Sequence, residues 1–236
     1  WWYICRVERL SVIWRIRITR CKNFKEMAMN QPNMTIQALL YRFGAALLLL
    51  LFSACGASNV VIEGNFPTPN VNKMPLSVAV IYEDALREFA YMEYSETGRE
   101  EINIESGQSH IRLFDAVLPA MFDRVVNVDT MEDAVEQKVD AVFAPVIEEF
   151  QLALPAKTKL DVYEVWIKYN MRLVTTEGDY IADWVLTSYG KTPTATFRSV
   201  QDGINGATVV ALRDLASSFS LSFSQVPEVS EWLRNL

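Results

Sequence analysis

The sequence is poor in the residues that most often carry chemistry. Its 236 residues include one histidine, His110, and three cysteines, of which only Cys55 lies beyond residue 21. A histidine that acts as a catalytic base needs a nucleophile and an orienting carboxylate, and no local pattern supplies them. A zinc site would have to consist almost wholly of carboxylates. We therefore interpret His110 as a polar residue at the start of a helix, and we expect no catalytic residue, no metal site and no cofactor.

Phosphate-binding and hydrolase motifs are also missing. There is no glycine-rich phosphate loop and no Gly-x-Ser-x-Gly segment. Residues 189–192 read Tyr-Gly-Lys-Thr, but the earlier glycine that a phosphate-binding loop requires is absent. Adjacent carboxylates on a strand point to opposite faces, so neighbouring pairs do not indicate a cleft with two converging carboxylates. The pairs in this sequence are Glu100–Glu101, Glu132–Asp133 and Glu148–Glu149.

No apolar run is long enough to span a membrane, but a shorter one is present. It covers residues 43–54 and follows Arg42 directly, whereas a spanning helix needs about 20 residues. A cationic flank, a short apolar run and small residues at its end are typical of a secretory signal. Residues 45–52 contain no polar residue, which disfavours an amphipathic core helix. The polar residues that follow Gly56 end the run too early for an uncleaved anchor.

The end of this run, Ser53-Ala54-Cys55, resembles the lipobox of bacterial lipoproteins, although Phe52 stands where that family prefers leucine. The resemblance implies cleavage before Cys55 and lipidation of Cys55, including palmitate. Gly56 after the cysteine implies sorting to the outer membrane. Two or more acyl chains anchor a protein stably, where one binds marginally. We therefore expect a lipid-anchored protein on the periplasmic face of the outer membrane.

The charge of the chain changes sign at the same place. Residues 1–54 carry eight Lys/Arg and two Asp/Glu, whereas residues 55–236 carry 14 and 27. Such an acidic domain repels phosphate backbones, so we expect no nucleic-acid partner. The first residues are basic and aromatic, typical either of upstream sequence outside the mature protein or of a membrane-surface segment. We expect an upstream segment over 1–33, a signal peptide over 34–54 that starts at Met34, Met29 or Met27, a flexible tether over 55–75, and a single domain over 76–236.

Apolar periodicity predicts that this domain is α+β. A mixed sheet would carry helices mainly on one face, with a βαβ rhythm in the first half. The tether is expected to be irregular because it is rich in proline, glycine and asparagine. Strands are expected over 76–82, 88–95, 101–105, 124–128 and 140–154. Helices are expected over 109–123, with Ser109 as N-cap and a kink at Pro119, and over 129–138, 199–223 and 228–236.

The clearest pattern is an antiparallel hairpin over residues 161–190. Apolar side chains alternate with polar ones before a turn at Glu177-Gly178. A two- or four-residue loop pairs positions whose numbers sum to 355, so that Met171 faces Trp184 and Tyr169 faces Leu186 on the buried side. On the wet side Arg172 faces Asp183, and Trp166 faces Tyr189. Trp166 and Tyr189 would then form an exposed contact surface for a protein partner, unless a helix or residues 59–75 cover them.

The order of these elements behind a lipobox resembles a group of small outer-membrane lipoproteins of uncharacterised function. The group includes YajG-type lipoproteins and, more distantly, curli-secretion and penicillin-binding-protein-activator lipoproteins. The resemblance covers residues 43–236 in outline and brings no catalytic residues. It implies a non-enzymatic, lipid-anchored periplasmic protein that acts as a binding or assembly accessory with an envelope protein partner. The alternatives are a lipid-anchored carboxylate hydrolase of envelope material and a subunit of a larger envelope transport complex.

Overall fold

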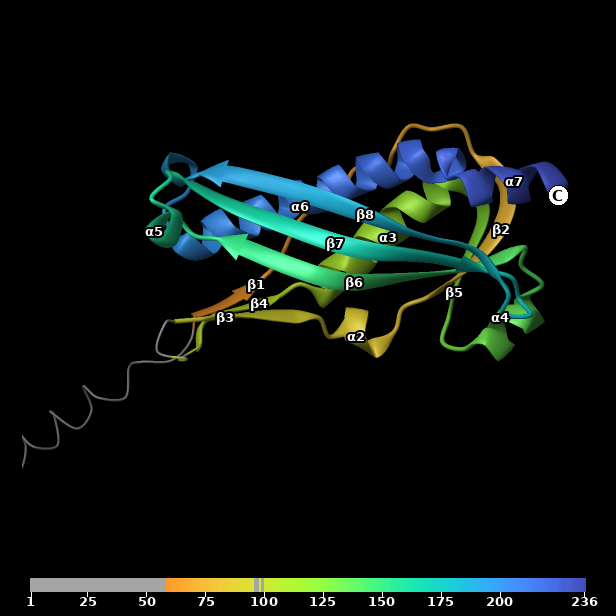
Figure 1. The fold of residues 1–236 in the computed structure, drawn as a ribbon, viewed down its shortest axis with the longest axis horizontal. Helices are drawn as coiled ribbons and strands as arrows, with labels where there is room; N and C mark the ends of the chain where they lie inside the picture. Colours follow the sequence, from red (N-terminus) through yellow and green to blue (C-terminus); the bar gives the residue numbers. More distant parts are fainter. Residues whose placement is uncertain (1–57, 96–97, 99) are drawn as a thin grey trace, which may run out of the picture. The chain divides into compact units, whose positions relative to one another are not determined.

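The computed structural model describes residues 58–95, 98 and 100–236, so the predicted signal peptide, Cys55 and the upstream segment lie outside the described residues. The described part forms two sheets with helices (Figure 1). The strands are β1 (Ser58–Val61), β2 (Met74–Ile81), β3 (Ala90–Tyr94), β4 (Glu100–Glu105), β5 (Phe122–Val128), β6 (Ala141–Ala153), β7 (Val162–Val174) and β8 (Tyr180–Pro193). The helices are α2 (Asp84–Arg87), α3 (Gly107–Met121), α4 (Met131–Gln137), α5 (Pro155–Thr158), α6 (Val200–Ser222) and α7 (Pro227–Asn235), with 3-10 turns η1 (Thr194–Thr196) and η2 (Phe223–Gln225).

The larger sheet has five strands in the order β5-β2-β6-β7-β8. Strand β2 pairs in parallel with β5 and β6, whereas β6, β7 and β8 are antiparallel. Strands β7 and β8 pair Met171 with Trp184 and Arg172 with Asp183. The predicted α+β class and the predicted register of the hairpin are therefore confirmed.

Helices α3, α6 and α7 pack on one face of this sheet, where one large core joins helix and strand side chains. Phe114 of α3 lies 5.6 Å from Phe143 of β6, and Phe219 of α6 lies 5.2 Å from Phe143, both measured between ring centroids. Helix α4 is the exception, because its Ala134 packs with Val142 in a second, small cluster. Helices therefore lie mainly on one face, as predicted. The other face of β6, β7 and β8, here called the open face, is turned toward the viewer in Figure 1.

The smaller sheet has three strands in the order β1-β4-β3 and corrects two predictions. A single sheet was expected, but β3 and β4 pair with each other rather than with the larger sheet. A tether was expected over residues 55–75, but residues 58–61 form β1, which pairs in parallel with β4. The reason is burial: Val60 and Ile62 are only 3% and 1% exposed. This hydrophobic gain outweighs the turn-forming tendency of the residues that follow.

Helix α3 begins earlier than predicted. Its N-cap is Ser106 rather than Ser109, and Ser109 lies in the first turn, where its hydroxyl donates to the carbonyl oxygen of Ile62 at 2.5 Å. Gly107 allows a close approach to the end of α2, since a Cβ atom there would lie 2.2 Å from the carbonyl oxygen of Arg87. Pro119 lies in the last turn of the helix, where the missing N–H group disturbs little of the helix that follows.

Helix α6 begins as predicted and lies against β8. The Ser199 hydroxyl accepts a hydrogen bond from the amide of Asp202 at 3.1 Å, which caps the first turn. Contact with β8 is closest at Gly190, where a Cβ atom would lie 2.1 Å from the carbonyl oxygen of Ala207 and 2.3 Å from the amide nitrogen of Ala211. The glycine thus lets the helix and the strand touch backbone to backbone and fixes the end of β8 on which Tyr189 lies.

Candidate functional site

Trp166 and Tyr189 lie opposite each other on β7 and β8, as the predicted register requires. Their ring centroids are 4.7 Å apart and their planes are tilted by 36°. Trp166 keeps 39% of its surface exposed. Neither a described helix nor the described part of the expected tether therefore buries it. The structure brings the two predicted residues together as one aromatic pair on the open face.

Tyr189 is held in place by polar contacts on both sides of its strand. Its hydroxyl donates to Oε1 of Glu164 at 2.6 Å, and its amide donates to Oδ2 of Asp214 on α6 at 3.0 Å. The hydrogen bond to the Glu164 carboxylate raises the pKa of Tyr189 to about 12. The phenol is therefore neutral at physiological pH, and its hydrogen bond to Glu164 orients the ring beside Trp166.

A shallow pocket of about 230 Å³ opens beside Trp166. Hydrogen-bonding side chains surround the indole, since Gln151 pairs with Trp166 across β6 and β7, and Thr187 lies opposite Lys168 on β8. The pocket thus combines one aromatic surface with donors and acceptors, as ligand and partner sites commonly do. Its lining residues are Glu149, Gln151, Trp166, Ile167, Lys168 and Thr187.

A β-bulge brings two neighbouring carboxylates to Lys168, which lines this pocket. The pairing of β6 with β7 shifts between Ile147 and Glu149, so that Glu149 faces Lys168. Glu148 also reaches Lys168, with Oε2 2.6 Å from Nζ. The expectation that Glu148 and Glu149 point to opposite faces is therefore wrong, because a bulge interrupts the alternation of the strand. The hydrogen bond to Glu148 raises the pKa of Lys168, which keeps its ammonium charged.

The sequence did not reveal the polar residues of the pocket. The register of the hairpin places Thr187 opposite Lys168, so this pair could have been derived from the sum of 355. Gln151 and Glu149 belong to β6, whose register against β7 depends on the bulge at Glu148. No local pattern in the sequence marks that bulge.

His110 lies in the core and not at the surface. Its Nε2 atom is 3.0 Å from the Ser106 hydroxyl, and its Nδ1 atom is 2.6 Å from the Tyr169 hydroxyl. All three residues are at most 1% exposed. Burial lowers the pKa of His110 to about 3, so the ring is neutral. Serine and histidine in contact could act as a nucleophile and a base. This pair, however, is buried away from any substrate, and Nδ1 of His110 is bound to the Tyr169 phenol. The Ser106–His110–Tyr169 contacts therefore stabilise the fold.

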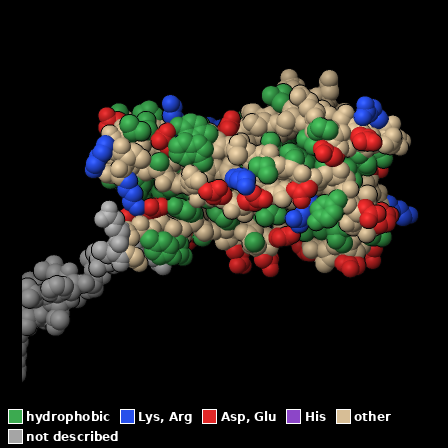
Figure 2. Space-filling model, viewed as in Figure 1, with side chains coloured by type: hydrophobic (Ala, Val, Ile, Leu, Met, Phe, Trp, Pro, Cys, Tyr) green, Lys and Arg blue, Asp and Glu red, His purple; other side chains and the backbone are tan. Residues whose placement is uncertain are grey.

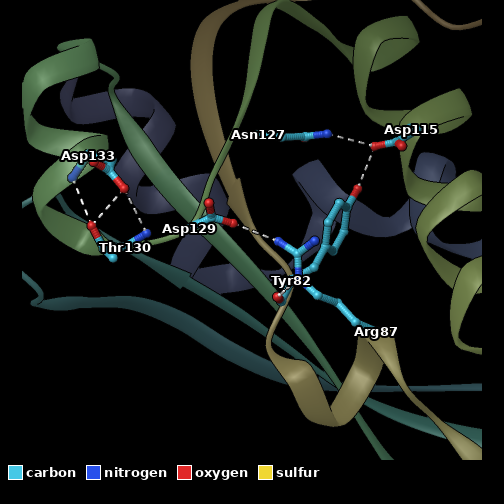
Figure 3. A network of polar contacts seen from close by, with 7 residues as sticks. All are labelled: Tyr82, Arg87, Asp115, Asn127, Asp129, Thr130 and Asp133. Carbon is cyan, nitrogen blue, oxygen red and sulfur yellow. Dashed lines mark hydrogen bonds and ion pairs between the residues drawn. The ribbon is translucent and has the colours of Figure 1, made fainter.

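A second polar network joins the carboxyl ends of the parallel strands β2 and β5 (Figure 3). The Tyr82 hydroxyl donates to Oδ1 of Asp115 at 2.9 Å, and burial raises the pKa of Tyr82 above its usual value. Arg87 donates to the Tyr82 carbonyl oxygen at 2.7 Å and to Oδ1 of Asp129 at 3.0 Å. Beside it, Thr130 and Asp133 form a capping box at the start of α4. These groups satisfy one another, so the network holds α2, α3 and α4 at this edge of the sheet.

A larger cavity of about 500 Å³ lies between the smaller sheet and the start of α3. Its walls include Arg87, Arg112 and Glu105. The Glu105 carboxylate accepts hydrogen bonds from Asn59 at 3.0 Å and Asn103 at 3.3 Å. The Glu105 carboxylate thus already has protein partners, and the cavity contains none of the residues predicted to be functional.

The described residues contain no group of three or more His, Cys, Asp or Glu that could hold a metal ion. Among the helices that the structure describes, none is long and apolar enough to cross a membrane. The predicted lipidation site, Cys55, lies outside the described residues. The open face with Trp166 and Tyr189, shown as a space-filling surface in Figure 2, is therefore the candidate binding site.

Comparison with known proteins gives distant structural likenesses. No family model and no curated protein matches the chain. A DUF330 protein from Xanthomonas campestris has a TM-score of 0.44 at 10% identity, over 72% of this chain and 95% of that chain. A minor lipoprotein from Acinetobacter baumannii has a TM-score of 0.36 at 12% identity, over 65% and 94%. Lipoprotein B from Nitrosomonas europaea has a TM-score of 0.34 at 16% identity, over 70% and 94%. These are likenesses of backbone arrangement at low identity, and they place the chain in no family.

Proposed function

We propose that this chain is a non-enzymatic, lipid-anchored protein of the bacterial envelope that acts as a binding or assembly accessory. Its anchor would be lipidated Cys55 on the periplasmic face of the outer membrane, as the lipobox over residues 43–55 predicts. The observation that carries the binding role is the exposed Trp166, paired with Tyr189 on the open face. A large aromatic side chain held at a solvent-facing surface is a typical anchor for a partner.

The open face suits a protein partner. Trp166 and Tyr189 form a rigid aromatic centre, and Glu149, Gln151 and Lys168 surround it with polar groups. Many protein interfaces have this arrangement of an aromatic centre and a polar rim. Exposed Val185 extends the surface along β8, opposite Asn170. The partner would be an envelope protein that shares the periplasmic space with the anchored domain.

A hydrolase is the less favoured alternative. The histidine of the chain is buried and neutral, so it is not available to a substrate at the surface. Glu148 forms an ion pair with Lys168, and Glu164 accepts a hydrogen bond from the Tyr189 hydroxyl. Carboxylates that are engaged in this way on a flat face lack the paired, opposed arrangement that glycoside hydrolysis requires.

The test is crosslinking in intact envelopes followed by capture of the protein and identification of what is bound. We expect Trp166→Ala to reduce the capture of a specific envelope protein at least tenfold, in the range of a hot-spot residue. The control is Val185→Ala, which removes an exposed apolar side chain from the same face, and it should leave capture within about twofold. Equal capture by wild type and Trp166→Ala would contradict the proposed role of the open face.

A further inference from the structure

One end of the domain contains Ser58, the first described residue after the predicted lipid anchor. We call it the anchor end and define it as residues 58, 159–161 and 191–200. The Ser58 hydroxyl accepts a hydrogen bond from Gln201 at 2.7 Å, which joins β1 to the start of α6. The amide of Thr194 donates to the carbonyl oxygen of Asp161 at 2.9 Å, which joins the end of β8 to the start of β7. Figure 1 shows α5, the end of β8 and the start of β1 at this end, on the left.

The covalent chain keeps this end close to Cys55. Ser58 follows Cys55 by three residues, and an extended chain spans at most about 3.6 Å per residue. The Cα atoms of Cys55 and Ser58 are therefore at most about 11 Å apart. Because β1 is part of the folded domain, no long tether separates the predicted lipid from the domain. A bilayer that holds lipidated Cys55 must lie near the anchor end.

The surface of the anchor end carries exposed apolar and exposed basic side chains. Leu160, Val200 and Phe197 are 54%, 47% and 36% exposed. Exposed basic side chains lie between them in the same segments: Lys159, Lys191 and Arg198. In Figure 2, hydrophobic and basic side chains lie together with acidic ones at the left end of the face shown.

The charge of this surface differs from that of the rest of the domain. Asp161 and Asp202 lie in and next to these segments, and Glu164 lies opposite Lys191 across β7 and β8, so three carboxylates accompany the three cations. Lys157, on α5 nearby, is paired with Glu93 at 2.5 Å and Glu101 at 3.8 Å, so it adds little free charge. Residues 55–236 as a whole are strongly acidic, with 27 Asp/Glu against 14 Lys/Arg. A surface on which cations balance carboxylates and apolar side chains are exposed can approach an anionic lipid surface that would repel the rest of this acidic domain.

We propose that the anchor end is a membrane-contact surface that docks on phospholipid headgroups beside lipidated Cys55. Leu160, Phe197 and Val200 enter the interfacial region, and Lys159, Lys191 and Arg198 attract anionic lipid. Exposed apolar side chains flanked by cations are the composition of interfacial binding surfaces, and an acyl anchor gains stability from a basic patch. The proposal rests on the proposed lipidation of Cys55. Membrane contact at the anchor end also sets how far the open face lies from the membrane, because Trp166 lies four residues along β7, roughly 13 Å from the start of that strand.

The test is amide hydrogen exchange on the full lipoprotein, purified from membranes and reconstituted through its own anchor. Vesicles of phosphatidylcholine with about one third phosphatidylglycerol are compared with vesicles of phosphatidylcholine alone and with detergent micelles. We expect residues 159–161 and 194–200 to exchange at least fivefold more slowly on the anionic vesicles, since each cation near such a surface is worth about fivefold in binding. Equal exchange rates in all three preparations would overturn the proposal.

Two triple variants separate charge at this end from charge in general. Lys159→Gln, Lys191→Gln and Arg198→Gln together should abolish the added protection. Lys73→Gln, Lys138→Gln and Arg234→Gln together remove equal charge at exposed sites elsewhere and should preserve it. Protection that appears in native envelopes but not in lipid vesicles would show that a protein covers this end, and would also overturn the proposal. If Cys55 is not lipidated, the protein fails to reconstitute at all, which distinguishes failure of the anchor from failure of the surface.

Discussion

The hydroxyl of Tyr169 lies 2.6 Å from Nδ1 of His110 inside the core. A second hydroxyl, that of Ser106, lies 3.0 Å from Nε2, so both ring nitrogens have a partner while the ring is neutral. One nitrogen of a neutral imidazole donates and the other accepts, and a hydroxyl can take either role. The arrangement therefore stabilises neutral histidine, and burial lowers its pKa to about 3.

This burial predicts a loss of stability in mild acid. The ordinary pKa of histidine is about 6.5, so below that pH His110 binds a proton in the unfolded chain but stays neutral in the folded chain. The contribution of neutral His110 to the free energy of unfolding is fully present above about pH 6.5. It falls by about 1.4 kcal/mol per pH unit as the pH drops toward the pKa of His110 in the folded chain. Between pH 7 and pH 5 the free energy of unfolding should drop by about 2 kcal/mol.

Urea unfolding at pH 7, 6 and 5 measures this drop. The chain has one histidine, His110. The variant His110→Phe should therefore be less stable than the wild type at pH 7, but its free energy of unfolding should be nearly independent of pH over this range. A variant with the same pH dependence as the wild type would show that another group causes the loss.

The two tryptophans of the hairpin should differ sharply in their effect on stability. Trp184 stacks on Phe219 at 6.4 Å and packs against the core, whereas Trp166 lies on the open face. Trp184→Ala should lower the free energy of unfolding by about 3 kcal/mol, because it leaves a cavity. Trp166→Ala should cost less than about 1 kcal/mol. Denaturant titration of both variants checks this, and a large loss for Trp166→Ala would place that side chain in the core.

Gly190 should tolerate no side chain. A methyl group there would meet the backbone of α6 at Ala207 and Ala211, which cannot move aside without displacing the helix. Gly190→Ala should therefore lower the free energy of unfolding by more than about 2 kcal/mol. The matched control is Gly178→Ala in the hairpin turn, where φ is +92° and no atom lies within 4 Å. That variant should cost about 1 kcal/mol from backbone strain alone, and similar melting temperatures for the two variants would contradict the close packing of α6 on β8.

The hairpin could be predicted in detail because its information is local. Period-two alternation indicates which side chains face the core, and the turn at residues 177–178 sets the register. That register predicts Trp166 opposite Tyr189, and the pairing of β7 with β8 confirms it. The charge pair Arg172–Asp183 on the wet side supports the same alignment, with 3.8 Å between Nε and Oδ2.

The features that escaped prediction depend on distant parts of the chain. Strand β1 is four residues long, and its partner β4 lies more than forty residues away, so turn-forming neighbours dominated the local pattern. His110 is buried because Tyr169, 59 residues along the chain, reaches it from β7. The bulge at Glu148 is a property of the pairing between β6 and β7, not of either strand alone.

The most direct measurement is the effect of Cys55→Ser on palmitate labelling and membrane fractionation. We expect Cys55→Ser to lose palmitate incorporation and the mature, membrane-bound form, while the wild-type chain keeps both. Unchanged labelling and fractionation of Cys55→Ser would contradict the proposal that this domain is held in the envelope by a lipid.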